Sequence, residues 1–335
     1  MAFDFPERVV HGGTGKLLRE KTHKNLLDFS ASTNPYPPSV PWKPDPSVLS
    51  CYPDDTYEEL KECIGKKFSR DPSEICVGNG SIELIRVFCS VVFHEPNRKK
   101  LFFARMPTFG EYALSARLSG ANPTDHVENA GVAFLCNPNN PTGFLIKRTD
   151  ILSRMNVLKN SGTMLFCDEA FIELSDPHES VADLRDPDLF VLRSLTKSFS
   201  VPGIRFGYGF GDADLIGKIE TARSPWTVNA FAESYAMEAF LHMDELAASR
   251  SAISRERTWL VAQITNLGLP CIPSSANYLL VNYGKNVAPL CTSLAQNSIL
   301  VRDCTSFGLP ECIRIAVRTH EENVQLLEVM AACLR

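Results

Sequence analysis

The sequence predicts an α/β protein with a large domain, in which helices flank a mostly parallel sheet, and a smaller α+β C-terminal domain. Between residues 75 and 210, short apolar runs alternate with helical stretches, which is typical of a parallel sheet covered by helices. After residue 228, a long helical stretch precedes several shorter strands. The length of 335 residues fits two domains of the usual size, roughly 100–200 residues each.

Three segments follow from these patterns. Residues 1–50 form an irregular N-terminal arm, which we expect to pack with the small domain and the functional site. The stretch Asn34–Pro53 contains seven prolines, so it should wrap over other elements instead of joining a sheet. Residues 51–228 form the large domain, and residues 229–335 form a linking helix and the small domain.

The first predicted helix runs from Thr56 to about Phe68, with Thr56 as its cap and Glu59 in the capping-box position. Further helices should begin near Ser81, Gly110 and Arg148. The strands between them are predicted at Ile75–Val77, Leu101–Ala104, Val132–Cys136, Met164–Cys167, Phe190–Leu192 and Phe206–Phe210.

The second half of the chain begins with one long helical stretch. It starts after Val228, reaches at least Ser249 and extends toward Thr265. The small domain should then contain strands at Tyr278–Val281, Ile299–Val301 and Ile313–Val317, with helices near Val287–Gln296 and Glu321–Leu334.

Composition excludes several classes of function. The 34 Lys and Arg against 39 Asp and Glu give a net charge of −5, which disfavours binding to nucleic acids or anionic membranes. The apolar run Val87–Phe93 is far shorter than a membrane span, and Asp4, Glu7 and Arg8 leave no apolar core for a secretory signal. Eleven scattered cysteines without a C-x-x-C pair predict a reduced, cytoplasmic protein with neither a disulfide framework nor a zinc site.

Unusual polar motifs follow the predicted strands, where ligands bind in open α/β sheets. Gly78-Asn79-Gly80-Ser81 follows one strand and opens a helix. Its glycines and the free N–H groups of the helix start can hold a phosphate, although a tight turn with a serine cap explains the same residues. Asn137–Gly143, with three asparagines and two prolines, forms a stiff polar loop or simply a well-formed turn.

Two further strand ends carry charged residues. Asp168-Glu169-Ala170-Phe171 follows a buried strand, so Asp168 lies in a site or caps the next helix. Ser194–Ser198 places Lys197 among hydroxyl groups, and Arg205 follows a Pro-Gly turn. Hydroxyl groups and an arginine can form a phosphate cup, and a lysine beside such a cup can form a Schiff base with pyridoxal phosphate.

In this order, the motifs together resemble the fold-type I pyridoxal-phosphate enzymes of the class I/II aminotransferase group. The resemblance extends from His11 to about Leu327. The motifs that carry it are G-N-G-S at 78–81, P-T-F at 107–109, N-P-N-N-P-T-G at 137–143, D-E-A-F at 168–171, S-L-T-K at 194–197 and G-I-R-F-G-Y at 203–208.

The resemblance implies that pyridoxal 5'-phosphate is the cofactor. Lys197 would bind it covalently, Asp168 would pair with its pyridinium nitrogen, Asn140 would hydrogen-bond its phenolic oxygen and Phe109 would stack on its ring. The position of Phe171 also contacts the cofactor in this group. The phosphate would be held by Gly80, Ser81, Ser194, Thr196, Arg205 and, from the neighbouring subunit of a homodimer, Tyr52.

Two branches of the group match different parts of the chain. Three features resemble the threonine-phosphate decarboxylases of the cobalamin side-chain pathway. They are His11-Gly12-Gly13, Phe171, where aminotransferases usually carry a tyrosine, and Arg318, where aminotransferases tend to have glycine. Histidinol-phosphate aminotransferases are resembled by Gly78–Ile85 and Val301–Asp303. We therefore expect decarboxylation of L-threonine O-3-phosphate, with transamination of histidinol phosphate as the alternative.

Both candidate substrates are small phosphorylated amino compounds, which implies anion-binding residues. Arg314 matches the arginine that binds the substrate α-carboxylate, and Asn34 matches an active-site asparagine of the arm. Because phosphate favours bidentate arginine, we expect Arg302, Arg318 and His11 to bind or frame the substrate phosphate. A surface ion pair with a helix carboxylate is the alternative for Arg318, and a simple turn is the alternative for His11.

A function without catalysis is the remaining alternative. Some members of this fold bind pyridoxal phosphate and an effector as regulators. Those carry a DNA-binding segment, for which this chain shows no spare residues, and a non-catalytic member would be expected to lose the lysine that stands here as Lys197.

Overall fold

The large domain contains a seven-stranded sheet in the computed structural model, which describes residues 5–13, 15, 20 and 26–334. Its strands are β2 (Ile75–Asn79), β3 (Leu101–Ala104), β4 (Asn122–Pro123), β5 (Val132–Cys136), β6 (Met164–Asp168), β7 (Leu189–Ser194) and β8 (Phe206–Phe210). The strand order is β2-β8-β7-β6-β5-β3-β4. Only β8 runs antiparallel to its neighbours, so the predicted mostly parallel sheet is confirmed.

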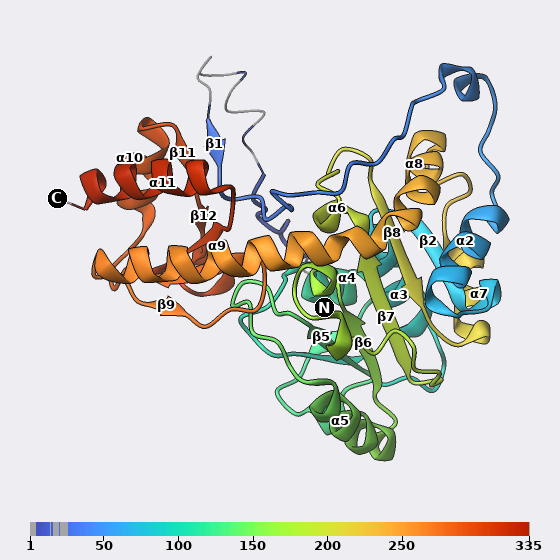
Figure 1. The fold of residues 1–335 in the computed structure, drawn as a ribbon. Coiled ribbons are helices and arrows are strands. Elements are labelled where there is room, and N and C mark those ends of the chain that lie inside the picture. Colours follow the sequence, from blue (N-terminus) through green and yellow to red (C-terminus); the bar gives the residue numbers. More distant parts are fainter. Residues whose placement is uncertain (1–4, 14, 16–19, 21–25, 335) are drawn as a thin grey trace.

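Helices cover both faces of this sheet (Figure 1). One face packs against α3 (Ser81–Val92), α4 (Glu111–Leu118) and α7 (Ala213–Ala222). The other packs against α2 (Glu58–Phe68), α5 (Arg148–Ser161) and α8 (Ala230–Leu241). Successive residues of a strand point to opposite faces, so in β7 the side chains of Phe190 and Leu192 lie in one core and Val191 in the other. Because both faces are buried, these strands are almost continuously apolar in sequence.

The small domain contains a four-stranded antiparallel sheet in the order β12-β13-β10-β9. Its strands and helices are β9 (Cys271–Ile272), β10 (Tyr278–Asn282), α10 (Ala288–Gln296), β12 (Arg302–Asp303), β13 (Cys312–Ala316) and α11 (His320–Cys333). A separate strand, β11 (Ile299–Leu300), pairs in parallel with β1 (Leu27–Asp28) of the N-terminal arm. The predicted strand over Ile299–Val301 therefore corresponds to β11 alone, and β12, which joins a different sheet, begins just after it at Arg302.

The helix α9 (Leu246–Asn266) connects the two domains, and Figure 1 shows it lying across the molecule between them. The predicted single helix after Val228 is broken instead into α8 and α9 by a short 3-10 turn, Met243–Glu245. Because α8 packs on α2 and β8, it covers the large sheet and is part of the large domain. The domain boundary that we expected at residue 228 therefore comes before α8, an element of the large domain.

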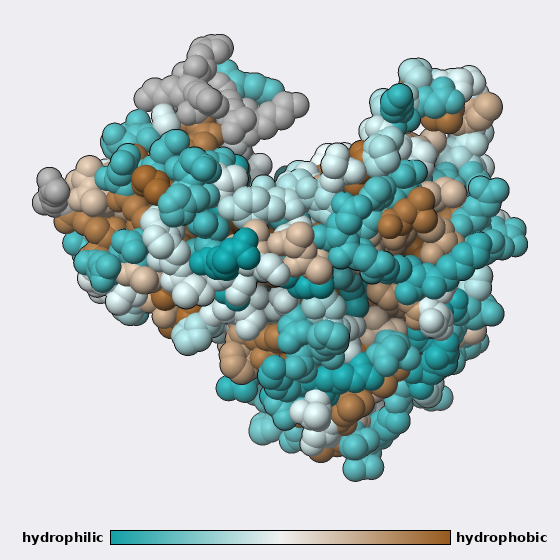
Figure 2. All heavy atoms as spheres, viewed as in Figure 1, coloured by the Kyte–Doolittle hydropathy of each residue, from teal (hydrophilic) through white to brown (hydrophobic). Residues whose placement is uncertain are grey.

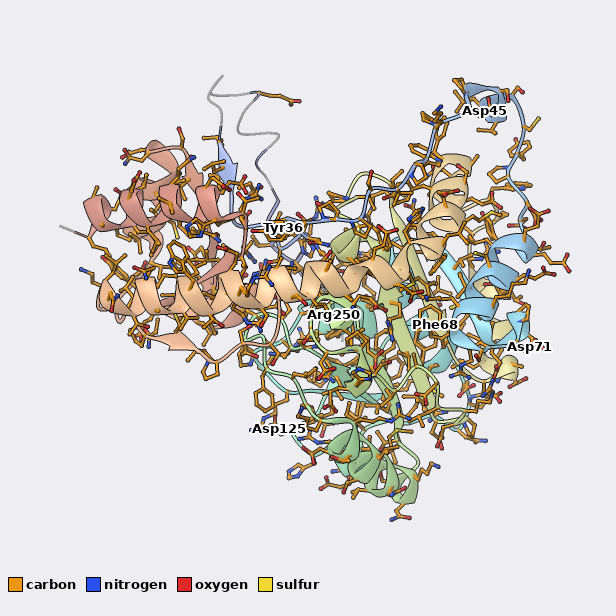
Figure 3. All side chains as sticks on the ribbon, viewed as in Figure 1. Tyr36, Asp45, Phe68, Asp71, Asp125 and Arg250 are labelled. Atoms are coloured by element: carbon orange, nitrogen blue, oxygen red, sulfur yellow. The ribbon has the colours of Figure 1, made fainter. Side chains whose placement is uncertain are left out.

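The arm runs along α9 after β1. The hydroxyl of Ser249 donates a hydrogen bond of 2.6 Å to the backbone oxygen of Tyr36, and Figure 3 places Tyr36 beside α9 and Asp45 at the outer end of a projecting segment. The visible face is mostly hydrophilic, with apolar atoms in small separate patches (Figure 2). Within the described parts of the chain, no helix is both long and apolar enough to cross a membrane.

The predicted capping box of the first helix is wrong. The helix begins at Glu58, after Tyr57 in a left-handed conformation, and has no side-chain cap of its own. Asp54 takes that role, because its carboxylate accepts hydrogen bonds from the backbone N–H of Glu58, 3.1 Å away, and from the hydroxyl of Thr56. Thr56 therefore donates to the capping residue and does not cap the helix itself.

Gly207 of β8 allows the start of α3 to approach the sheet. A Cβ atom at Gly207 would lie 2.4 Å from the backbone nitrogen of Ser81. We expect Gly207→Ala to destabilise the protein by about 1–3 kcal/mol through this overlap, measured as the free energy of unfolding in urea. The matched control is Gly217→Ala in α7, where a Cβ meets nothing within 4 Å. It should stabilise the protein by about 0.5–1 kcal/mol, and equal effects of the two changes would contradict the overlap.

Candidate active site

A cavity of about 480 Å³ lies at the carboxyl ends of β5, β6 and β7, between the large domain, the small domain and the arm. Because these strands are parallel, their ends meet at one edge of the sheet, and the residues that follow them share a site. The predicted site residues that line it are His11, Ser81, Phe109, Asn140, Asp168, Phe171, Ser194, Thr196, Lys197, Arg205, Arg302 and Arg314.

Four predicted site residues do not line the cavity. Gly80 lies directly behind it, since a Cβ there would be 2.3 Å from the Arg205 guanidinium. The side chain of Asn34 hydrogen-bonds the backbone of Ser198 and Tyr36, so it holds the short helix that carries Lys197. The two others are Arg318 and Tyr52.

Arg318 and Tyr52 have other partners. The Arg318 guanidinium forms two hydrogen bonds, of 2.7 and 3.0 Å, with the carboxylate of Glu322 one helical turn later, and also contacts the backbone oxygen of Asp28. Tyr52 is 78% exposed, and its ring lies 4.5 Å from the ring of Trp226.

Asp168 is the buried acid of the cavity. The hydroxyl of Tyr112 donates a 2.6 Å hydrogen bond to Oδ2 of Asp168, and the backbone N–H of Ala170 donates one of 2.9 Å to Oδ1. Burial raises the pKa of Asp168 to about 6, although both hydrogen bonds act in the opposite direction by stabilising the carboxylate. A cation next to this carboxylate would oppose the effect of burial and lower the pKa again.

Lys197 lies on the short helix α6 (Leu195–Ser198), directly after β7. Its pKa is lowered to about 8, first by burial and then by the positive charges of Arg314 and Arg205. Among the described residues, no carboxylate pairs with its Nζ, which lies 5.9 Å from the ring centre of Phe171. A lysine with this pKa is partly neutral near pH 8 and can act as a nucleophile.

A cup of polar groups surrounds one end of the cavity. Gly80, with φ of +77°, is the residue before α3 and has no side chain that could cap the helix. The first N–H groups of α3 therefore have no side-chain acceptor. Ser81 and Thr196 contribute hydroxyl groups, and Arg205 contributes a guanidinium. Free N–H groups at a helix start, hydroxyl groups and an arginine together suit a phosphate.

The polar loop 137–143 divides its asparagines between structure and site. Asn137 and Asn139 bind backbone and side-chain groups around the loop, including the backbone N–H and oxygen of Ile146. Asn140 alone of the three lines the cavity, and its Oδ1 accepts a hydrogen bond from Arg314. Because Oδ1 is occupied in this way, Asn140 is left with its amide N–H groups to donate to a ligand oxygen.

Arg314 and Arg302 form the cationic wall on the small-domain side. They are direct cross-strand partners on β13 and β12, and each is 7% exposed. Arg314 donates to Asn140 and, at 2.9 Å, to the backbone oxygen of Ser30, while its buried Nε has no hydrogen-bond partner among the described residues. No carboxylate of the described chain lies in ion-pair contact with either arginine, so both charges remain available to an anionic ligand.

Phe171 contributes an apolar surface. Its ring meets the ring of Tyr278 edge-on at 5.0 Å, and Tyr278 also packs 5.1 Å from the Arg314 guanidinium. The hydroxyl of Tyr278 donates to the backbone oxygen of Asn139 and so connects the small domain to the polar loop.

Sequence reasoning missed Tyr112, which holds the buried acid from a position 56 residues earlier in the chain. The available signal was its place one turn after Phe109, since residues three apart lie on the same face of a helix. The rings of Phe109 and Tyr112 are 5.5 Å apart, so one helix start supplies both a ring-stacking residue and the partner of Asp168.

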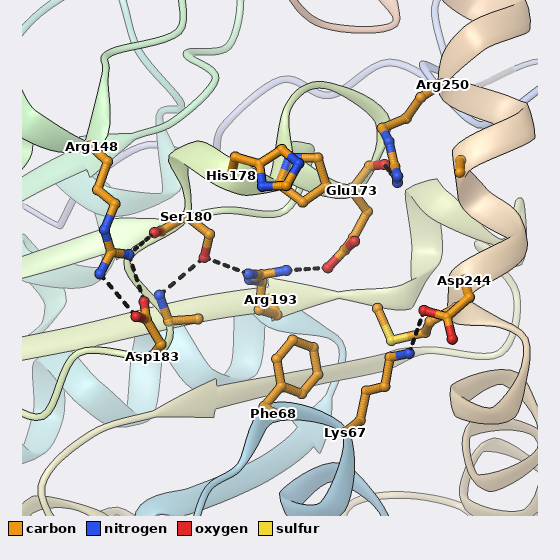
Figure 4. A pocket seen from close by; sticks show the side chains of 14 residues that line it. Lys67, Phe68, Arg148, Glu173, His178, Ser180, Asp183, Arg193, Asp244 and Arg250 are labelled. Carbon is orange, nitrogen blue, oxygen red and sulfur yellow. Dashed lines mark hydrogen bonds and ion pairs between the residues drawn. The ribbon is translucent and has the colours of Figure 1, made fainter.

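A second cavity, of about 680 Å³, contains none of the predicted site residues (Figure 4). Its floor is Arg193, which pairs with Glu173 and hydrogen-bonds Ser180. Lys67 pairs with Asp244 at its side. Since three of the four arginines and lysines that line it already have carboxylate partners, this cavity suits an anion less well than the first.

The raised pKa of Asp168 leads to a prediction for the protein without ligand. A carboxyl whose pKa rises on folding destabilises the folded state above that pKa, because the charged form is favoured in the unfolded chain. We expect Asp168→Asn to increase the free energy of unfolding at pH 8 by about 2–3 kcal/mol. The increase should disappear near pH 4, where Asp168 is largely neutral in the folded protein. A difference that does not depend on pH would contradict this assignment.

Comparisons with known proteins agree with the geometry. Residues 44–330 match the family described as aminotransferase class I and II. The histidinol-phosphate aminotransferase of Symbiobacterium thermophilum is 28% identical over 338 residues, covering 94% of this chain and 92% of that protein. A protein of Caldanaerobacter subterraneus subsp. tengcongensis with the name "Putative threonine-phosphate decarboxylase" is 32% identical over 321 residues, covering 88% and 86%.

A solved structure shows the same fold. The histidinol-phosphate aminotransferase from Sinorhizobium meliloti, in complex with pyridoxal-5'-phosphate, superposes with a TM-score of 0.81 at 19% identity over 96% of this chain and 94% of that one. The expected fold type I is thereby confirmed.

The cavity fits pyridoxal 5'-phosphate. The cofactor is an aldehyde with a phosphate group. The unpaired Lys197 suits the aldehyde, and the cup at the start of α3 suits the phosphate. The buried, unpartnered Nε of Arg314 suits an anionic substrate. The chain belongs to the family of class I and II aminotransferases, whose cofactor is pyridoxal 5'-phosphate.

Proposed function

We propose that this protein decarboxylates L-threonine O-3-phosphate to (R)-1-aminopropan-2-ol phosphate and CO2, a step of cobalamin biosynthesis. The observation that carries the proposal is the pair Arg302 and Arg314, two buried cross-strand arginines without a carboxylate partner in the described chain. A substrate with both a carboxylate and a phosphate supplies one anion for each arginine. The Caldanaerobacter relative and Phe171 support the same choice.

In this proposal the large domain holds the cofactor. Lys197 binds it, Asp168 pairs with its ring nitrogen, Asn140 donates to its phenolic oxygen, and Phe109 covers the ring. Gly80, Ser81, Ser194, Thr196 and Arg205 hold its phosphate. When bound, pyridoxal 5'-phosphate supplies an electron sink that weakens the bonds at the α-carbon of an attached amino acid.

The orientation in which the protein holds the substrate selects which of these bonds breaks. The bond that stands perpendicular to the ring is the one weakened, so the position of the substrate carboxylate selects decarboxylation or proton removal. Arg314 is fixed by Asn140 and by the backbone of Ser30, and therefore presents the carboxylate in one orientation. Arg302 and His11 bind the phosphate, and Lys197, with a pKa of about 8, supplies or accepts a proton at Nζ.

Transamination of histidinol phosphate with 2-oxoglutarate is the second candidate. It is favoured by the Symbiobacterium relative, which covers more of both chains, and by the motif Val301-Arg302-Asp303. Histidinol phosphate has no carboxylate for Arg314, so in this alternative the arginine would serve the acceptor, 2-oxoglutarate.

We also propose a cytoplasmic homodimer. Tyr52 is highly exposed and does not line the cavity of its own subunit, which suits a residue that reaches the cofactor phosphate of a neighbouring subunit. The eleven cysteines, all within the described residues, are free, which suits a reducing compartment.

A product assay tests the proposal. The purified protein, reconstituted with pyridoxal 5'-phosphate, is given O-phospho-L-threonine alone or histidinol phosphate with 2-oxoglutarate. We expect CO2 and aminopropanol phosphate in the first reaction, without any keto acid. Glutamate formation in the second reaction, with none of these products in the first, would establish the aminotransferase instead.

Substitution of the arginines tests which of them bind substrate. We expect Arg302→Gln to raise the KM for the phosphorylated substrate about 10- to 100-fold, because a charged hydrogen-bond donor to an anion is worth about 1.5–3 kcal/mol. Arg318→Gln should leave KM within about twofold, since Glu322 already holds that guanidinium outside the cavity. An equal rise in KM for both variants would contradict this prediction and show that Arg318 also binds the substrate.

A further inference from the structure

Glu111, the first residue of α4, carries a buried carboxylate that none of the proposed cofactor contacts uses. The residue is 3% exposed. Its Oε1 lies 2.8 Å from Nε2 of His11, and its Oε2 lies 3.6 Å from the Arg86 guanidinium without a hydrogen bond among the described residues. The His11 hydrogen bond is the main reason why the pKa of Glu111 is lowered, so the carboxylate is ionised.

The hydrogen bond also defines the state of His11. An ionised carboxylate only accepts hydrogen bonds, so Nε2 of His11 carries the hydrogen. The other ring nitrogen, Nδ1, has no partner in the described chain, and the residue lines the cavity. Glu111 therefore determines which nitrogen of His11 remains free for a ligand.

The arm around His11 is held between the two domains. Nη2 of Arg302 in the small domain donates a 2.7 Å hydrogen bond to the backbone oxygen of Val10. On the other side, Val9 lies against Gly110, where an added Cβ would be 3.1 Å from Cγ1 of Val9. Residues 9–13 form a wall of the cavity, and the contact between Glu111 and His11 is the only side-chain hydrogen bond that the described part of this wall makes with the large domain.

We infer that Glu111 is a positioning residue: its carboxylate holds His11 and thereby fixes residues 9–13 as the wall that closes on the substrate anion. The effect on substrate rests on the proposed function, whereas the effect on the arm does not. Glu111 follows Phe109 and Gly110 and precedes Tyr112, so the same helix start contacts the proposed cofactor site, the arm and the buried acid.

Hydrogen exchange of the cofactor-loaded protein, without substrate, tests the effect on the arm. In Glu111→Gln, which keeps the shape but loses the charge, and in His11→Ala, we expect the amides of residues 5–13 to exchange about tenfold faster, since one charged hydrogen bond is lost. The matched control is Arg86→Gln, because Arg86 is the other, more distant and exposed, partner of Glu111. It should leave the exchange unchanged. Unchanged exchange in both Glu111→Gln and His11→Ala would overturn the inference, as would faster exchange in Arg86→Gln alone.

Kinetics test the effect on substrate. With whichever of the two candidate substrates reacts, Glu111→Gln should raise KM about tenfold and leave kcat within about twofold. The double variant should have the KM of His11→Ala alone, because Glu111 acts through His11. Multiplicative effects of the two changes would overturn that route. If neither substrate reacts, the proposed function fails, while the hydrogen exchange still decides whether Glu111 holds the arm.

Discussion

Arg193 and Glu169 form a buried ion pair directly behind the cavity, with Nε of Arg193 2.9 Å from Oε2 of Glu169. Each is the neighbour in sequence of a cavity residue: Glu169 follows Asp168, and Arg193 precedes Ser194. Since side chains alternate between the faces of a strand, the ion pair lies on one face of the sheet and the cofactor residues point to the other. The ion pair therefore fixes the ends of β6 and β7 to each other. Removing one partner of such a buried pair costs about 3–5 kcal/mol, so the spacing of the proposed cofactor residues is strongly enforced.

The cavity itself is electrostatically unfavourable until ligands enter it. Lys197 has a lowered pKa, Asp168 has a raised one, and burial also lowers the pKa of Arg314. Behind the sheet the opposite holds, because Arg193 is matched by two carboxylates. The fold thus pairs buried charges with opposite charges behind the sheet, where the strands must be held rigidly. It leaves buried charges without such partners where ligands bind. Ligands that neutralise these charges bind the folded protein and not the unfolded chain, so they stabilise the fold, and tighter binding gives a larger stabilisation.

The central strands were predictable because burial on both faces makes them continuous apolar runs, and Asp168, Ser194 and Lys197 were predictable as site residues because they follow those strands. Phe109 and Arg314, in contrast, were expected in the site only through the resemblance to the family. The two-residue strands β1, β4, β9 and β12 were not predicted, since so few residues carry no periodic signal. Tyr112 was missed because its partner Asp168 is distant in sequence. Arg302 and Arg318 look alike in sequence, both standing at strand ends in the small domain. The difference is Glu322, four residues after Arg318, which binds its guanidinium and keeps it out of the cavity.

The pairing of β1 with β11 joins residues 27–28 to residues 299–300, about 270 positions apart. During synthesis, the segment that contains Leu27 emerges long before the strand it pairs with exists. At about 5–20 residues per second, a ribosome needs tens of seconds to add the intervening chain. The large domain can fold during that time, because all seven strands of its sheet have been made by residue 210. The arm acquires its β11 partner only after residue 300 has been translated, so the part of the cavity next to β1 is completed later than the sheet behind it.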